Sequence, residues 1–339
     1  MAMDWDADTV NASTLSSGKN LRASNVTSIA KEGNPIKVVF IVGFTRSGST
    51  LLEHLLSIAP GTVAVGEMAY LWEPEVRNTS YCGCGIKLAC CPFWKRILTA
   101  QQCLDFEKDR SPETPQFRRF FGDLICRRYS ASNPGYRQFL DRIEYIYGAI
   151  SDQTQGSVII DSSKRPIFGL AVSRLPGINV TLIHLVRDSR GCAFSWTKRK
   201  ARLELGQKAF MSRLSAPRAA LAWTGKNLQA DILRIQRCRH IFLRYEDLVR
   251  RPAFEVNKIL TQIGLSSISP DANGIFHAPV SHGIWGNPDR WSNSMHAIKV
   301  TKDERWVTGL STRDFAITTL ISAPLLKWYG YRLFRSRQG

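Results

Sequence analysis

The sequence predicts a three-layer α/β fold, in which helices flank a central and mostly parallel sheet. Short apolar runs rich in β-branched residues alternate with longer segments of helical spacing, and a glycine-rich loop joins the first run to the first helix. The apolar runs have the length and composition of buried parallel strands. Strands are expected at 37–42, 62–65, 157–160, 180–186 and 240–243, and helices at 50–56, 116–129, 136–150, 217–237 and 254–263.

Composition indicates how the chain is organised. Its first residues are polar and rich in Ser, Asn and Thr, so we expect a flexible arm at 1–34 and a single domain at 35–339. A helical insertion that contacts the substrate is expected at about 82–151. The sequence has no signal peptide pattern and no apolar stretch long enough to span a bilayer, so a cytoplasmic protein is expected.

The chain is strongly basic. Lys and Arg number 46 against 28 Asp and Glu, which gives a formal net charge of +18 at pH 7. This surplus favours an anionic partner, and nucleotides, nucleic acids, sulfated or phosphorylated substrates and acidic membranes all meet that description. A generally basic soluble surface has the same composition, so charge alone does not choose among these partners.

A glycine-rich loop, Gly43–Thr50, lies between the first expected strand and the first expected helix. Such a loop aims backbone N–H groups and a helix N-terminus at a phosphate. Against the Walker pattern G-x-x-x-x-G-K-[ST], Thr50 matches, but Ser49 stands at the lysine position and the cation lies inside the loop as Arg46. Nucleoside triphosphatases need that lysine together with magnesium. The loop is therefore P-loop-like but better suited to a 5′-phosphate, the alternative being a glycine turn without a ligand.

A second basic motif follows the strand expected at 180–186. Arg187 comes directly after this strand, and open α/β sheets bind ligands at the carboxyl ends of their strands. Ser195 lies about two helical turns further on, and Arg199 lies one turn beyond it on the same helix face. A solvated helix face is the alternative interpretation, which suits the lysines of this segment better than it suits Arg187.

Together, the two motifs resemble the sulfotransferases that use 3′-phosphoadenosine 5′-phosphosulfate (PAPS) and release PAP. Gly43–Thr50 is similar to their 5′-phosphosulfate loop, in the variant of tyrosylprotein, carbohydrate and many bacterial members, and 181–195 is similar to their 3′-phosphate element. Later segments at 243–249, 281–290 and 328–331 are also similar, so the resemblance spans roughly 37–331. It implies a nucleotide site made of Arg46, Ser47, Gly48, Ser49, Thr50, Arg187, Ser195, Arg199, Tyr245 and Arg290.

Sulfuryl transfer to an alcohol or phenol needs cations around the bridging oxygen. Arg46 is the first candidate, and Lys164, which follows the strand expected at 157–160, is the second. The family has a lysine or serine in this segment, so Ser162 carries over as well. Asp161 is expected to anchor the same loop through hydrogen bonds. The resemblance implies no requirement for a metal ion.

The same reaction needs a base for the acceptor proton. Glu67 follows a glycine after the strand expected at 62–65 and resembles the glutamate base of tyrosylprotein sulfotransferases. Glu73 is the rival carboxylate, and Glu67 is preferred. His54 lies among apolar residues of the first helix and is expected to be packed.

Four of the eight cysteines, Cys82, Cys84, Cys90 and Cys91, fall within ten residues. Their C-x-C-x5-C-C spacing lacks the paired C-x2-4-C pattern of zinc knuckles, and a disulfide would be unusual in a reducing cytosol. Similar segments that continue as Cys-Pro-Phe-Trp occur in bacterial-type sulfotransferases. A structural loop is therefore preferred to a disulfide, and a disulfide to a metal site, and no metal ligands are assigned.

Two other functions are compatible with parts of the sequence. A P-loop-like nucleotide kinase would need the lysine that Ser49 replaces. A nucleic-acid-binding protein would use the basic segment 187–202, but there the aromatic residues do not interleave with the cations, so no nucleic acid partner is expected. The acceptor implied by the resemblance is a hydroxyl or amine of a small molecule, glycan, lipid or peptide.

Overall fold

The computed structural model describes residues 35–98, 134–199, 210–235, 238–287 and 296–334. Its centre is a five-stranded parallel sheet in the order β2-β3-β1-β4-β5. Because β2 and β3 lie on one side of β1 and β4 and β5 on the other, the connections change direction at β1, where open α/β sheets bind ligands. The strands are Ile36–Gly43 (β1), Thr62–Gly66 (β2), Val158–Lys164 (β3), Ile178–Val186 (β4) and Arg239–Arg244 (β5).

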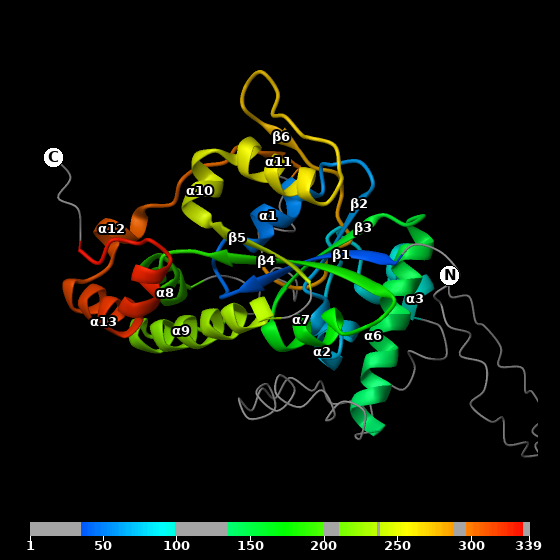
Figure 1. Cartoon of the computed structure of the whole chain (residues 1–339), viewed down its shortest axis with the longest axis horizontal. Coiled ribbons are helices and arrows are strands. Elements are labelled where there is room, and N and C mark those ends of the chain that lie inside the picture. Colours follow the sequence, from blue (N-terminus) through cyan, green and yellow to red (C-terminus); the bar gives the residue numbers. More distant parts are fainter. Residues whose placement is uncertain (1–34, 99–133, 200–209, 236–237, 288–295, 335–339) are drawn as a thin grey trace, which may run out of the picture.

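Helices cover both faces of this sheet, which confirms the predicted three-layer α/β fold (Figure 1). Neighbouring residues of β1 show why both faces are buried: Val39 and Ile41 pack in one core cluster, and Phe40 and Val42 pack in the other. The first cluster is closed by α1 (Ser49–Leu56) and α11 (Pro252–Gln262), and the second by α6 (Pro134–Gln153), α7 (Pro166–Ser173) and the end of α9 (Ala216–Ile232).

All five predicted strands are present, but β3 continues past its predicted end to Lys164. The residues Asp161, Ser162 and Ser163 read as a polar loop in the sequence, yet their side chains are buried and bonded to protein partners. A polar stretch can remain in a buried strand when its side chains find such partners. Lys164 is therefore the last residue of β3 and lies at the carboxyl edge of the sheet.

Four predicted helices correspond to α1, α6, α9 and α11, whereas the helix predicted at 116–129 lies outside the described residues. The prediction for α9 was wrong at its end: the helix stops at Ile232 and is followed by a short 3-10 helix, Leu233–Ile235, because the chain must enter β5 at Arg239. Pro217 stands in the first turn of α9, where its missing N–H costs no hydrogen bond.

The remaining elements surround these layers. Described parts of the predicted insertion at 82–151 include Pro92–Leu98 (α3) and α6. The division of the chain into an arm and one domain stays a prediction. Among the described residues, no helix combines the length and the apolar character that crossing a membrane requires. The remaining elements that surround the layers are Met68–Tyr70 (η1), Pro74–Thr79 (α2), Leu88–Cys90 (η2), Pro92–Leu98 (α3), Ser189–Thr197 (α8), Tyr245–Arg250 (α10), Phe276–His277 (β6), Ala297–Ile298 (β7), Arg305–Gly309 (α12) and Thr312–Trp328 (α13).

Side chains distant in sequence fix the carboxyl end of β4. The indole of Trp223 donates to the carbonyl of Arg187 (2.9 Å), and the hydroxyl of Tyr331 donates to the carbonyl of Val186 (3.3 Å). Glu246 accepts from the hydroxyl of Tyr331 (2.6 Å) and from the backbone N–H of Asp188 (3.1 Å). The backbone that carries Arg187 is therefore held from several sides.

Candidate functional site

A cavity of about 1090 Å³ lies at the carboxyl ends of the strands. Each strand of the sheet supplies a lining residue at its end or shortly after it: Glu67 after β2, Lys164 in β3, Arg46 after β1, Arg187 after β4 and Tyr245 after β5. Among the described lining residues, two are acidic, Glu67 and Asp303, and seven are basic: Arg46, Lys164, Arg187, Lys198, Arg199, Lys299 and Arg305. This excess of positive charge favours an anionic ligand.

The cavity brings together most of the residues predicted from the sequence. Its lining contains Arg46, Gly48, Ser49, Thr50, Glu67, Lys164, Arg187, Ser195, Arg199 and Tyr245. Ser47 and Ser162 do not line it: the Ser47 hydroxyl lies 3.6 Å from the sulfur of Cys192, and the Ser162 hydroxyl donates to Glu53. Glu73 does not line it either, and Arg290 lies outside the described residues.

The loop between β1 and α1 has a backbone that its sequence explains. Gly48 is the N-cap of α1 with φ of 90°, in the left-handed region that glycine adopts most readily. A Cβ atom at this position would lie 2.6 Å from the ring of Tyr245, so the close approach of the two segments also requires glycine. The N-terminal N–H groups of α1 have no acceptor within the helix and can bind an anion.

Backbone strain is concentrated around the cavity. Four non-glycine residues of the described chain have positive φ, and three of them line the cavity: Arg46 (70°), Lys164 (63°) and Trp285 (57°). Left-handed conformations of such residues cost free energy and persist where the surrounding structure imposes them. Their grouping is typical of a functional site rather than of a passive surface.

At one end of the cavity, a buried arginine binds a carboxylate. Arg187 is 6% exposed, and its Nη2 donates to Asp303 Oδ2 at 3.1 Å. Hydrogen bonds from Arg305 and then Arg187 hold the pKa of Asp303 well below its usual range. The guanidinium also stacks on Tyr245, 4.5 Å from the ring centre. Within the described residues, the buried Nε of Arg187 has no hydrogen-bond partner, so this side chain can bind a further anionic group.

At the other end, a lysine and a glutamate form a buried ion pair. Lys164 Nζ contacts Glu67 Oε1, and both side chains are less than a tenth exposed. Lys164 also donates to the carbonyl of Ser162 (3.0 Å). Gly286 packs so closely on Glu67 that a Cβ atom there would overlap the carboxylate. The acidic and the basic group are thus held side by side against one wall of the cavity.

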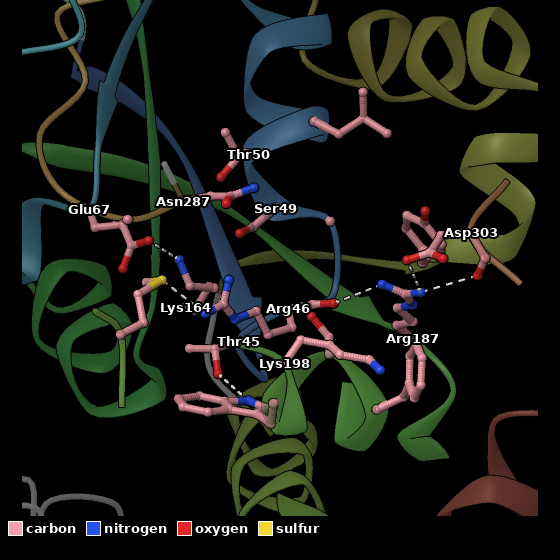
Figure 2. A pocket seen from close by; sticks show the side chains of 18 of the residues that line it. Thr45, Arg46, Ser49, Thr50, Glu67, Lys164, Arg187, Lys198, Asn287 and Asp303 are labelled. Carbon is pink, nitrogen blue, oxygen red and sulfur yellow. Dashed lines mark hydrogen bonds and ion pairs between the residues drawn. The ribbon is translucent and has the colours of Figure 1, made fainter. Parts of the chain in front are cut away.

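Arg46 lies between these two ends, as Figure 2 shows. Its guanidinium is 5.5 Å from the centre of the Trp196 ring and contacts the sulfur of Met211 at 2.9 Å. Trp196 is itself held by a hydrogen bond from its indole to the hydroxyl of Thr45 (3.2 Å). A cation in this position faces whatever group spans the cavity from one end to the other.

Two buried carboxyl groups anchor the Lys164–Glu67 end of the cavity from behind. Glu53 of α1 accepts from the backbone N–H of Gly66 (2.9 Å) and from the hydroxyl of Ser162 (2.5 Å), which ties α1 to β2 and β3. Asp161 accepts from Ser163 and from the hydroxyl of Tyr147 (2.5 Å). Asp161 therefore acts as an anchor of its strand, and it does not line the cavity.

Sequence reasoning missed several residues of this site. Glu53 carries a visible signal, because a charged residue inside an otherwise apolar helical run must find a buried partner. Asp303 carries none, since its partner Arg187 is more than a hundred residues away. Trp285 and Asn287 line the cavity from a loop that the sequence assigns only by resemblance.

Comparisons with known proteins identify a family for this chain. A family model described as a sulfotransferase domain matches residues 37–276, which is more than half of the chain. Among solved structures, the chain is similar to the sulfotransferase domain from the curacin biosynthetic pathway, with 16% identity and a TM-score of 0.48 over 89% of this chain and 100% of that one. It is also similar to sulfotransferase STF9 from Mycobacterium avium, with 15% identity and a TM-score of 0.44 over 89% and 79% of the two chains. No curated protein matches the sequence. On the strength of the family model, the chain belongs to the sulfotransferase family.

Proposed function

We propose that this protein transfers a sulfuryl group from PAPS to a hydroxyl or amine acceptor and releases PAP. One observation carries the proposal: a single cavity is lined by the glycine loop, by Arg187 with Ser195, and by the Lys164–Glu67 pair. The first two are separate anion sites, and the third joins a cation to a candidate base. PAPS has anionic groups at both its 5′ and 3′ positions, which matches the two anion sites.

The residues present fit such a donor. Arg187 has a buried donor atom without a partner, and Ser195 adds a hydroxyl on the same side of the cavity, so both would hold the 3′-phosphate. Arg199 lines the cavity beyond Ser195 and would add a more exposed contact. At the 5′ end, the N–H groups at the start of α1 and the side chains of Ser49 and Thr50 would hold the phosphosulfate.

Tyr245 supports the nucleotide between these two ends. Its ring packs against Gly48 and against the guanidinium of Arg187, and it lines the cavity. An aromatic ring in this position would border the adenine or ribose. Ser47 would contribute only its backbone N–H, since its hydroxyl faces Cys192.

When bound, PAPS supplies an activated sulfuryl group whose bridging oxygen gains negative charge during transfer. Arg46 and Lys164 are the cations that would stabilise this charge. Glu67, held beside Lys164 and accessible from the cavity, would accept the proton of the acceptor hydroxyl or amine. Glu67 is preferred to Glu73 because only the former lines the cavity.

The acceptor would approach through the aromatic part of the lining next to Glu67. Tyr70 and Trp285 form a ring pair with centres 5.5 Å apart, and both line the cavity. Rings of this kind offer an apolar surface to a small molecule, a lipid, a peptide or a glycan ring. Their position beside the proposed base favours an acceptor that presents its hydroxyl or amine next to an apolar or ring-shaped group.

Thermal unfolding with added nucleotide tests the donor site. A ligand at a hundred times its dissociation constant stabilises the folded state by about 2.7 kcal/mol. We expect PAP to stabilise the protein equally with and without magnesium, and ATP to give a smaller shift because it has no 3′-phosphate. If ATP with magnesium stabilises the protein more than PAP does, the proposal fails and a nucleotide kinase takes its place. Transfer of labelled sulfate from PAPS to panels of phenols, glycans, lipids and peptides then identifies the acceptor.

A further inference from the structure

Three of the clustered cysteines meet a histidine that is distant in sequence. The sulfurs of Cys82, Cys84 and Cys91 and a ring nitrogen of His282 all lie within 4.8 Å of one another. Nδ1 of His282 is 3.6 Å from the sulfur of Cys82 and 3.5 Å from that of Cys91, and the sulfurs of Cys84 and Cys91 are 3.6 Å apart. Cys90, from the same segment, is exposed and does not belong to this group.

We propose that Cys82, Cys84, Cys91 and His282 bind a structural Zn²⁺ ion. A tetrahedral zinc ion with bonds of about 2.3 Å to sulfur and about 2.0–2.1 Å to nitrogen keeps its ligand atoms about 3.6–3.8 Å apart. The separations of 3.5–3.6 Å given above agree with this spacing. Three cysteines and one histidine form a complete structural ligand set, and binding would release the thiol protons to solvent.

The main alternative is a disulfide between Cys84 and Cys91. Bonded sulfurs lie about 2.05 Å apart, whereas these two are 3.6 Å apart. A disulfide would also use only two of the three sulfurs and would not involve His282, which contacts Cys82 and Cys91. Four donors converging on one point are explained by a shared ion, and soft sulfur ligands in a tetrahedral arrangement favour zinc.

The surroundings of His282 keep its ring in position. Phe93 stacks on the imidazole with ring centres 4.4 Å apart and an angle of 3° between the planes. The indole of Trp94 donates to the carbonyl of His282 at 2.8 Å, and the N–H of Gly83 donates to the carbonyl of Gly283 at 2.8 Å. The stacking fixes the plane of the imidazole, and the two hydrogen bonds fix the backbone that carries it.

The proposed ion would tie the cysteine segment to a wall of the large cavity. Two residues after His282, the N–H of Ile284 donates to Val65 (3.0 Å) and its carbonyl accepts from the N–H of Glu67 (2.9 Å). Gly286 then packs on the Glu67 carboxylate. Zinc would thus act on the reaction only through position, by holding this loop against Glu67. The metal site itself does not depend on the proposed sulfuryl transfer.

Metal content tests the proposal directly. Full-length protein purified under reducing conditions, with zinc in the growth medium, should contain about one zinc per chain by mass spectrometry of metals. Exchange with Co²⁺ should give the ligand-field bands of a tetrahedral site and thiolate charge-transfer absorption. Cys91→Ser and His282→Ala should lower zinc affinity at least about tenfold. Cys90→Ser and Cys238→Ser are matched controls and should retain the metal.

Several results would overturn the zinc site. Wild-type protein without stoichiometric zinc would do so, as would a different metal at stoichiometric level or full zinc retention in the Cys91 and His282 variants. A count of six titratable thiols instead of eight, in protein purified and unfolded without reductant and with a metal chelator, would indicate a disulfide. The wild-type metal content and cobalt spectrum decide the matter even if a variant fails to fold.

The proposed effect of zinc on the position of Glu67 is tested by measuring kcat. Removal of zinc should lower kcat by up to about a hundredfold, since a displacement of 1 Å near a reacting group can have that effect. The stabilisation by PAP should persist, because Arg46, Arg187, Ser195 and Tyr245 line the cavity from other segments of the chain. Loss of zinc without any change in kcat would restrict the ion to a role in folding. Failure of PAP to bind the zinc-loaded protein would instead count against the proposed donor.

Discussion

Two ion pairs lie at opposite ends of the cavity, and they are built differently. Lys164 and Glu67 stand at the ends of the neighbouring strands β3 and β2, and both are almost fully buried. Arg187 also stands at a strand end, but its partner Asp303 comes from a connecting segment and is about a quarter exposed. Asp303 is further shared with the exposed Arg305.

The difference suggests two tasks. A pair fixed by adjacent strands keeps a base and a cation at a constant distance from each other, and proton transfer requires a base in a defined position. A pair whose acid has a second cation can open, because Asp303 keeps Arg305 as a partner while Arg187 turns to a phosphate. We therefore expect the Lys164–Glu67 end to govern turnover and the Arg187–Asp303 end to govern nucleotide affinity.

The largest effect on turnover is expected at the Lys164–Glu67 pair, called the fixed pair because adjacent strands hold it. Glu67→Gln keeps the shape of the side chain but removes the proposed base, and loss of a general base typically lowers kcat by about 10²–10⁴-fold. PAP affinity should stay nearly unchanged, since nucleotide contacts do not involve this carboxylate. Steady-state kinetics on a proven acceptor measures the effect, with Glu73→Gln as a control that keeps activity. Wild-type kcat in the Glu67 variant would remove Glu67 from its role.

A smaller loss, of nucleotide affinity, is expected at the Arg187–Asp303 pair, called the exchangeable pair because Asp303 can keep Arg305 as its partner. Arg187→Ala removes charge-assisted hydrogen bonds worth roughly 1.5–3 kcal/mol, so PAP should bind about ten- to a hundredfold more weakly by calorimetry. Ser195→Ala should weaken PAP less. Adenosine 5′-phosphosulfate has no 3′-phosphate and should be nearly indifferent to both changes. Equal losses for the two ligands would mean that the residues act on folding instead.

Behind the fixed pair, Asp161 should make stability depend on pH. Burial raises the pKa of its carboxyl to about 7 from 3.8, so between about pH 4 and pH 7 the folded state holds a proton that the unfolded state has lost. Its contribution to stability is therefore present at pH 4 and is lost as the pH rises to 7, by at most about tenfold per pH unit in the folding equilibrium.

Urea unfolding of Asp161→Asn tests this sign. The free energy of unfolding of the wild type, minus that of the variant, should fall between pH 4 and pH 7. Asp152→Asn replaces an exposed residue at the end of α6 and should follow the wild type. A difference that grows with pH would show that Asp161 is ionised in the folded protein throughout this range.

The smallest effect is expected from the acid of the exchangeable pair. Asp303→Asn removes a carboxylate that competes with a phosphate for Arg187, so PAP should bind with unchanged or few-fold higher affinity. Glu304→Gln is the matched control, because Glu304 pairs with Lys302 and does not line the cavity. If Asp303→Asn weakens PAP as much as Arg187→Ala does, Asp303 holds Arg187 in place and the pair is not exchangeable.

The two pairs also differ in how well the sequence predicts them. Glu67, Lys164 and Arg187 each stand at or just after the end of a strand that β-branched composition reveals, and parallel strands bring their carboxyl ends to one edge. Local pattern together with the family resemblance therefore pointed to three of the four members. Asp303 lies in a segment with no strand or helix signal of its own, and only the tertiary fold brings it to Arg187.

The same reasoning explains the cysteines. Cys82, Cys84 and Cys91 are visible as a cluster, but the fourth member is His282, far along the chain and in a loop without a metal-binding pattern. Spacing rules for zinc sites describe ligands that come in sequence pairs, so they reject a site completed by a single distant residue. The polar end of β3 was missed for a related reason, since the partners that let it be buried lie on α1 and α6.

The left-handed backbone at Arg46, Lys164 and Trp285 limits how this protein can be made more robust. Glycine at such positions would relieve the strained conformation but would remove the two cations and the ring that face the cavity. Directed evolution toward higher melting temperature would therefore meet opposing demands here, because substitutions that relax Arg46 and Lys164 would remove the cations proposed to act in sulfuryl transfer. Stabilising substitutions are better sought on the outer faces of the helices, away from the strand ends.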